Sequence, residues 1–164
     1  MFTIRRARQE DKEAIWRVHV RAVRETCASH YPREVIELWA GRLRPEKYGE
    51  AIDGNEFFVA EEEGGAVVGF GELDPAGGEV AGLYVSPDAG RRGVGRGLLS
   101  TLEERARSFG LKSLQLTSSL NAVAFYERAG FEALERMSKT LAPGVERASV
   151  RMFKELPPSA EGMP

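Results

Sequence analysis

The sequence contains few cysteines and histidines, the residues that form disulfides in small secreted proteins and that bind metal ions. It contains one cysteine, Cys27, and two histidines, His19 and His30, among 164 residues. A single cysteine cannot form an internal disulfide and is typical of a reducing compartment. Because these three residues lack the spacing of a metal-ligand cluster, we expect no metal site. We interpret Cys27 as a small residue of the core.

Long apolar runs and an excess of charge are also missing. Nowhere do about 18 consecutive apolar residues occur, which a membrane-spanning helix requires, and the first ten residues are charged from Arg5 onward, unlike a secretory signal. The 23 basic and 25 acidic residues give no positive field for a nucleic-acid backbone. We therefore expect a cytoplasmic globular protein with neither nucleic acid nor membrane as a partner.

The length favours one domain, and hydrophobic periodicity predicts its elements. The expected order is strand 2–6, helices 10–24 and 32–43, strands 57–60, 66–73 and 79–85, helix 94–109, strand 114–117, helix 122–129, and strands from 131 and over 148–154. Pro45 is expected to stop the second helix, and Gly110 to cap the long one. This order predicts an α/β protein in which helices cover a mixed sheet. The domain should span 2–155, with 156–164 as a disordered tail.

A cluster of glycine and arginine, RRGVGRG at 91–97, stands where a strand meets the long helix. Each glycine in a helix is less favourable than alanine by about 1 kcal/mol, so three in the opening turns need a compensating reason. The free N–H groups and positive dipole end of a helix start suit a phosphate, and arginines there would favour a polyanion. The alternative is a tight turn with solvated arginines. The spacing matches neither a P-loop nor a dinucleotide fingerprint.

Two blocks carry a family resemblance. LYVSPDAGRRGVGRGLL at 83–99 and SLNAVAFYERAGF at 119–131 resemble, in order and spacing, the GCN5-related N-acetyltransferase superfamily. The resemblance covers about residues 2–155. It implies the acyl-CoA N-acyltransferase fold, a mixed and mostly antiparallel sheet flanked by helices, and acetyl-CoA as co-substrate. Gly90 departs from the family pattern, which commonly has Gln or Arg at that position.

The resemblance also implies residue roles on the donor side. The backbone of Leu83, Tyr84 and Val85 would pair with the pantetheine arm of the cofactor like an added strand. Asn121 matches a position that often hydrogen-bonds this arm, and Tyr126 matches the usual proton donor to the departing sulfur. The N–H groups of one loop would hold the pyrophosphate: Arg91, Arg92, Gly93, Val94, Gly95 and Arg96.

Transfer to an amine needs a base, because an alkyl ammonium is protonated at neutral pH and cannot attack a thioester. Glu79 matches the glutamate that serves as base in the histone-modifying members. Glu72 is the second candidate, acting through a water. For both, the alternative is a solvated glutamate at a hairpin. Bound amine and thioester can react directly in a ternary complex, without a covalent intermediate.

The acceptor side is less defined by the sequence. In the superfamily the first two helices commonly shape the acceptor pocket, so the resemblance makes Tyr31 and Trp39 candidate substrate residues, with His30 and Tyr48 beside them. Ordinary core packing is the alternative. We expect a primary amine of a small molecule or peptide as acceptor. A peptide or protein N-terminal acetyltransferase and a non-catalytic acyl-CoA sensor stay open, as do monomer and homodimer.

Overall fold

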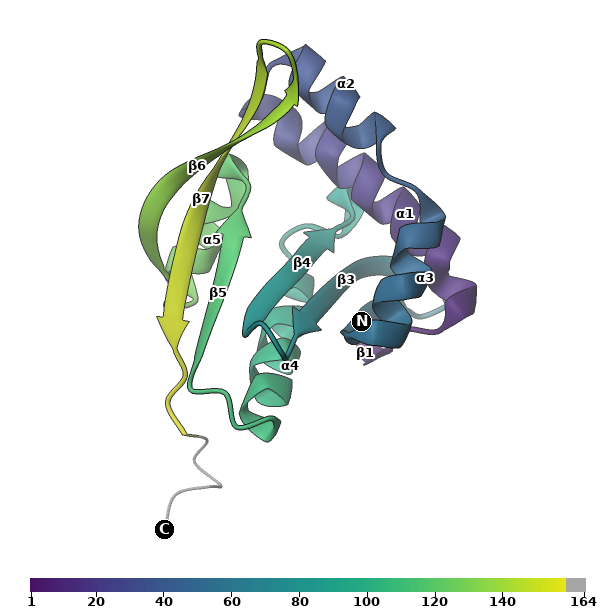
Figure 1. Cartoon of the computed structure of the whole chain (residues 1–164). Coiled ribbons are helices and arrows are strands. Elements are labelled where there is room, and N and C mark those ends of the chain that lie inside the picture. The colour runs from purple at the N-terminus through teal and green to yellow at the C-terminus, as the bar shows by residue number, and fades with distance from the viewer. Residues whose placement is uncertain (159–164) are drawn as a thin grey trace.

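The computed structural model describes residues 1–158, which form one mixed sheet covered by helices on both faces (Figure 1). The strands are β1 (Phe2–Arg6), β2 (Glu56–Glu62), β3 (Val67–Asp74), β4 (Glu79–Val85), β5 (Ser113–Ser118), β6 (Glu132–Ala142) and β7 (Val145–Glu155). Their order in the sheet is β1-β2-β3-β4-β5-β7-β6. Neighbours run antiparallel except β4 and β5, which are parallel. This confirms the predicted mixed, mostly antiparallel sheet.

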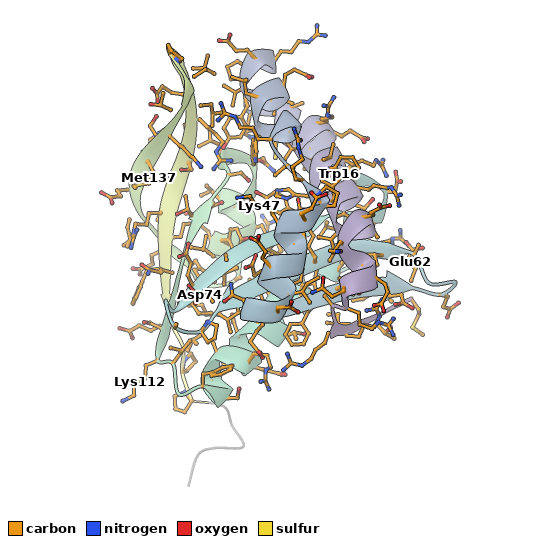
Figure 2. The ribbon with its side chains drawn as sticks, turned by 45° about the vertical axis from the view of Figure 1, so that its right-hand side comes forward. Trp16, Lys47, Glu62, Asp74, Lys112 and Met137 are labelled. Atoms are coloured by element: carbon orange, nitrogen blue, oxygen red, sulfur yellow. The ribbon has the colours of Figure 1, made fainter. Side chains whose placement is uncertain are left out.

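One face of the sheet carries the first three helices, and the other carries the last two. The first group is α1 (Lys12–Arg21), α2 (Arg33–Gly41) and α3 (Pro45–Gly54); the second is α4 (Val94–Ser108) and α5 (Val123–Arg128). After α1 the chain continues through a π turn at Ala22–Thr26 and a 3₁₀ turn at Cys27–Ser29. Further 3₁₀ turns lie at Gln9–Asp11, Pro87–Ala89 and Leu120–Ala122. In Figure 2, Trp16 and Lys47 mark α1 and α3 in front of the sheet.

Helix α3 corrects the expected role of Pro45. This proline occupies the first turn of α3. Proline lacks an N–H group, and in the first turn this costs no hydrogen bond, because N–H groups there have no partner within the helix. Pro45 does follow the end of α2, as predicted, but it begins a new helix instead of opening a loop. Helix α3 of the first layer was therefore not predicted from the sequence pattern.

The alternation of side chains along the strands divides the core between the two layers. On β2, Phe58 and Ala60 pack with α4, whereas Phe57 and Val59 pack on the side of α1 and α3. Leu102 of α4 is fully buried, in agreement with the predicted apolar face of that helix.

The C-terminal end of the domain extends slightly further than predicted. Leu156, expected to begin the tail, is 7% exposed and packs in the core, and its N–H donates to the Lys112 carbonyl at 2.8 Å. Residues 159–164 of the predicted tail lie outside the described residues.

The sheet opens at its centre. Within residues 1–158, strands β4 and β5 pair only at Glu79–Gln115 and Val80–Leu116, and they diverge beyond these residues (Figure 1). The register of β3 against β4 also shifts between Glu72 and Leu73. Such an irregularity bends a strand, so the ends of β4 and β5 that follow the pairs separate.

Candidate active site

A first cavity, the donor groove, lies where β4 and β5 diverge. Its volume is about 210 Å³. It is bounded by the end of β4, the start of α4, the 119–126 segment and the turn after α1, through Ala22, Thr26, Cys27, Leu83, Tyr84, Val85, Gly95, Ser119, Asn121, Ala122, Phe125 and Tyr126. The structure thus brings together most of the donor-side residues that the sequence singled out.

The edge of β4 that faces the groove carries backbone N–H and C=O groups that do not pair with β5. Pairing with β5 stops at Val80, so Leu83, Tyr84 and Val85 pair with β3 on one side only within the described residues. Unpaired strand edges accept an extended ligand as an additional strand. A linear molecule with amide groups fits this edge.

The start of α4 presents unpaired N–H groups beside the groove. The first bond within the helix runs from the Gly97 N–H to the Gly93 carbonyl at 3.0 Å, so the N–H groups of Val94, Gly95 and Arg96 precede the helical ladder. Val94 as a whole residue is 2% exposed, and its side chain belongs to the core. Gly95, which lines the groove, and exposed Arg96 are therefore better placed than Val94 to bind a ligand.

The arginines of this loop differ in their surroundings. All three arginines are exposed, and Arg92 in addition pairs with Glu62 at 3.1 Å. Arg91 has a φ of 68°, in the left-handed region, which is unfavourable for a residue other than glycine by about 1–2 kcal/mol. The loop holds Arg91 in this conformation directly before the helix start.

The three glycines of the loop have three separate structural reasons. Gly93 has a φ of 80° and precedes the helix. A Cβ at Gly95 would lie 3.2 Å from the Phe125 ring, and one at Gly97 would lie 3.0 Å from Ile4 of β1. The interpretation of all three as openings for a ligand is therefore too broad, because Gly97 serves the packing of α4 on the sheet.

Two polar side chains of the groove suit a thioester cofactor. Asn121 has a buried Oδ1 with no hydrogen-bond partner in the described part of the chain, and a buried acceptor of this kind requires a donor from a ligand or water. Tyr126 is 6% exposed, and burial raises its pKa, which keeps the phenol protonated. Burial also raises the pKa of the Cys27 thiol to about 11, so it is no nucleophile at neutral pH.

A second cavity of about 310 Å³, the acceptor pocket, lies against β3 and β4 beside the first helices. Its lining comprises His19, Trp39, Arg42, Leu43, Tyr48, Phe70, Glu72, Ala81, Gly82, Tyr84, Lys139, Leu141 and Arg147. Tyr84 lines both this pocket and the donor groove. A smaller cavity of about 50 Å³ between β4 and β5 is also lined by Tyr84 and Tyr126.

The two candidate bases are separated by the fold. Glu72 lines the acceptor pocket, where its Oε2 accepts a hydrogen bond from Asn55 Nδ2 at 2.7 Å. Burial raises the pKa of Glu72, and the nearby charges of Asp74 and Glu79 add to this. Glu79 instead pairs with Asp74 at the hairpin end and lines neither cavity. The structure therefore favours Glu72 over Glu79.

The four candidate acceptor residues also divide into two groups. Trp39 and Tyr48 line the acceptor pocket. Tyr31 does not, because its hydroxyl donates to the Ala148 carbonyl at 2.6 Å and accepts from the Leu120 N–H at 2.9 Å. It ties the turn after α1 to β7. His30 is exposed beside Ser29 and lies outside the pocket.

His19 is a polar residue of the pocket that the sequence analysis set aside. Its Nδ1 lies 2.8 Å from the Tyr48 hydroxyl, its ring lies 4.0 Å from the Tyr84 ring, and its buried Nε2 has no partner among residues 1–158. Burial lowers the pKa of His19 to about 3, so the imidazole is neutral. The spacing from Ile15 to His19 places both on the buried face of α1, a signal that was present in the sequence.

Metal sites and membrane-spanning helices are both absent from residues 1–158. Among them, no group of three His, Cys, Asp or Glu side chains is arranged to hold a metal ion. None of the helices formed by residues 1–158 combines the length and apolar character needed to cross a bilayer.

The fold and the two adjoining cavities define an acyltransferase of the type that takes its acyl group from a coenzyme A thioester. The family model described as "Acetyltransferase (GNAT) domain" matches residues 27–146, which is more than half of the sequence. The chain therefore belongs to the GNAT family and is an N-acetyltransferase that depends on acetyl-CoA.

Individual relatives agree with this assignment. An IAA acetyltransferase of Azospirillum brasilense is 31% identical over 111 residues, covering 60% of this chain and 72% of the relative. A GCN5-related N-acetyltransferase structure from Rhodopseudomonas palustris has a TM-score of 0.86 at 29% identity, covering 94% and 95% of the two chains. The putative acetyltransferase YncA of Salmonella typhimurium, solved with acetyl-CoA, has a TM-score of 0.71 at 25% identity, covering 98% and 96%.

Proposed function

We propose that the protein transfers an acetyl group from acetyl-CoA directly to a primary amine in a ternary complex. The observation that carries this proposal is the position of Tyr84, which lines both the donor groove and the acceptor pocket. Two ligands that bind on either side of one residue are close enough to react without a carrier on the protein. The neutral, buried Cys27 thiol agrees with a direct transfer.

On the donor side, the protein contributes mainly backbone groups. The N–H groups of Gly95 and Arg96 hold the diphosphate at the start of α4. The open edge of β4 aligns the pantetheine arm, and Asn121 Oδ1 accepts a hydrogen bond from an amide of this arm. Exposed Arg91 and Arg96 add positive charge beside the phosphates.

The reaction needs two proton transfers, one from the amine and one to the leaving sulfur, and a different residue carries out each. Acetyl-CoA supplies an acetyl thioester with a thiol leaving group. Glu72, with its raised pKa, accepts the proton that the amine must lose, directly or through a water. Tyr126, kept protonated by burial, donates a proton to the leaving sulfur. Glu79, the base that the family pattern suggested, lies outside both cavities.

The two alternative functions, N-terminal acetylation of a peptide or protein and acyl-CoA sensing without catalysis, require different features of these cavities. A peptide or protein N-terminus requires an open cleft that admits a chain, and the acceptor pocket, bordered by the β6–β7 hairpin residues Lys139, Leu141 and Arg147, is partly open to solvent. A sensor without activity requires no base, whereas half-buried Glu72 lines this pocket. The position of Glu72 favours an active enzyme, and a peptide N-terminus stays the alternative acceptor.

The proposal is tested by titrating the protein with acetyl-CoA and following thiol release with a panel of amines. Glu72→Gln should lower kcat by about 100- to 10,000-fold, which is the usual contribution of a general base. Glu79→Gln is the matched control on the neighbouring strand and should retain activity. Tight acetyl-CoA binding without thiol release from any amine would contradict an enzymatic role, and loss of activity in the Glu79 variant alone would reverse the assignment of the base.

A further inference from the structure

The acceptor pocket is unequally charged. One carboxylate, Glu72, lines it together with three cations, Arg42, Lys139 and Arg147. The ion pairs formed within residues 1–158 include none of these three cations. Arg42 and Lys139 are exposed and Arg147 is partly buried, so their positive charges, which have no protein counterion among these residues, attract an anion that enters the pocket. The lining therefore suits an anionic group.

The charges of opposite sign act on different parts of the pocket. Burial has the largest effect on both pKa values, lowering that of His19 and raising that of Tyr84, and the positive charge of Arg147 acts on both groups as well. The charges that act on the pKa of Glu72 are the carboxylates Asp74 and Glu79. Glu72 thus lies at a negative end of the pocket formed by β3 and β4, and the cations lie at a positive end formed by the β6–β7 hairpin and the residue after α2.

The positive end contains an unfavourable pair of like charges. Lys139 of β6 and Arg147 of β7 are direct partners in the register of the hairpin. Like charges at directly opposed positions of an antiparallel pair are destabilising. An anion bound between the two side chains would change this repulsion into attraction, so the pair has the arrangement of an anion site and is unfavourable as a purely structural feature.

The guanidinium groups at this end are held in place before any ligand binds. Arg147 lies over the Trp39 ring at 4.4 Å from its centroid, and Arg42 donates to the Leu141 carbonyl. A guanidinium has five N–H donors, so each retains donors for a ligand. Arginine pairs with carboxylates or phosphates in bidentate geometry, which adds specificity to the attraction.

From these observations we infer that the acceptor amine also carries an anionic group, as a free amino acid does. This inference rests on the proposed function and names the substrate class of the same site. The amine lies at Glu72 and Tyr84, and the anionic group lies at Lys139, Arg147 and Arg42. The unpartnered Nε2 of neutral His19 makes a further hydrogen bond to the acceptor. A volume of about 310 Å³ suits a ligand of this size.

The experiment compares amines that differ only in the anionic group. L-amino acids and ω-amino acids are each tested beside the corresponding amide and the decarboxylated amine, with acetyl-CoA and the full-length protein. The best amino acid should exceed both of its uncharged counterparts in kcat/KM by about 10- to 100-fold, the effect of one or two charge-assisted hydrogen bonds. Calorimetry with the CoA-loaded protein should show the same order of affinities without turnover.

Three variants separate the anion site from general effects. Lys139→Gln and Arg147→Gln should reduce the preference for the acid over the amide by about tenfold or more, mainly through KM. Lys139 is exposed, so its variant should fold normally. Lys112→Gln is the matched control, because Lys112 is exposed and distant from the hairpin tip (Figure 2). Its preference should equal that of the unmodified protein.

The outcomes distinguish this inference from the proposed function. Amides or diamines that react and bind as well as the acids would overturn the anionic acceptor while leaving acetyl transfer intact. An unchanged acid preference in the Lys139 and Arg147 variants would overturn the assignment of the site. If no amine is acetylated, the proposed function fails, and calorimetry alone decides whether the pocket selects anions.

Discussion

Lys154 and Glu103 form a partly buried ion pair that joins the two functional segments of the second layer. The Lys154 ammonium on β7 donates to both Glu103 carboxylate oxygens on α4, at 2.8 and 2.9 Å, and to the Ala129 carbonyl after α5 at 2.7 Å. The side chains are 18% and 10% exposed. Removal of either charge leaves the other without its partner in a largely dry environment.

The magnitude follows from this burial. Loss of one member of a fully buried pair destabilises a protein by about 3–5 kcal/mol, whereas an exposed pair contributes about 0–1 kcal/mol. With less than a fifth of either side chain exposed, Glu103→Leu and Lys154→Met should each lower the free energy of unfolding by about 2–4 kcal/mol. The double variant places two apolar side chains together, so it should lose clearly less than the sum of the single variants.

Urea unfolding of the four proteins measures this coupling. Equal slopes with shifted midpoints identify changes in stability alone. The cycle should give an interaction energy of at least about 1 kcal/mol, as contacting residues do. Single variants that lose less than about 1 kcal/mol, or losses that simply add, would refute the argument that this pair is buried enough to require its partner.

Three further predictions concern the active site. Replacing Tyr126 with Phe should slow acetyl transfer but leave acetyl-CoA affinity nearly unchanged, and equal kcat values would remove its assigned role as proton donor. Gly93→Ala should weaken acetyl-CoA binding and destabilise the protein by about 1–2 kcal/mol, because its φ of 80° is unfavourable for alanine; Gly54→Ala, in open space at the end of α3, is the control in thermal unfolding and calorimetry. The acid limb of the kcat profile should lie above the ordinary carboxylate range, since burial raises the pKa of Glu72 and only the deprotonated form accepts a proton. Glu72→Gln should abolish this limb, and a limb that persists would identify another base.

Local patterns predicted the elements that depend on short-range chemistry. The long helix α4 has its apolar face, with Leu98 and Leu102 buried, and Gly110 follows it with a φ of 79°. The residues of the donor groove could be predicted for the same reason, because most of them occur in two continuous blocks of the sequence. Pro45 shows the limit of this reasoning, since proline is compatible with both the end of one helix and the first turn of the next.

The acceptor pocket could not be derived from the sequence in the same way. Its lining comes from three helices or their flanking turns, two central strands and the distant β6–β7 hairpin. Arg147 and Glu72 are separated by the whole of α4, β5 and α5 in the chain, and only the strand order brings them to one cavity. The choice between Glu72 on β3 and Glu79 on β4 depended on the same information, because the sequence does not indicate which of the two residues lines the pocket.

The sheet consists of two parts, β1–β4 and β5–β7, which are connected through two residue pairs between β4 and β5. In the binding mode proposed above, a cofactor arm aligned along β4 would lie in the separation between them and would supply hydrogen bonds that β4 and β5 do not form with each other. A ligand that binds only the folded state raises the free energy of unfolding in proportion to the logarithm of its concentration. Acetyl-CoA should therefore act as a structural component of the sheet as well as a reactant, and slower hydrogen exchange along β4 would report its presence.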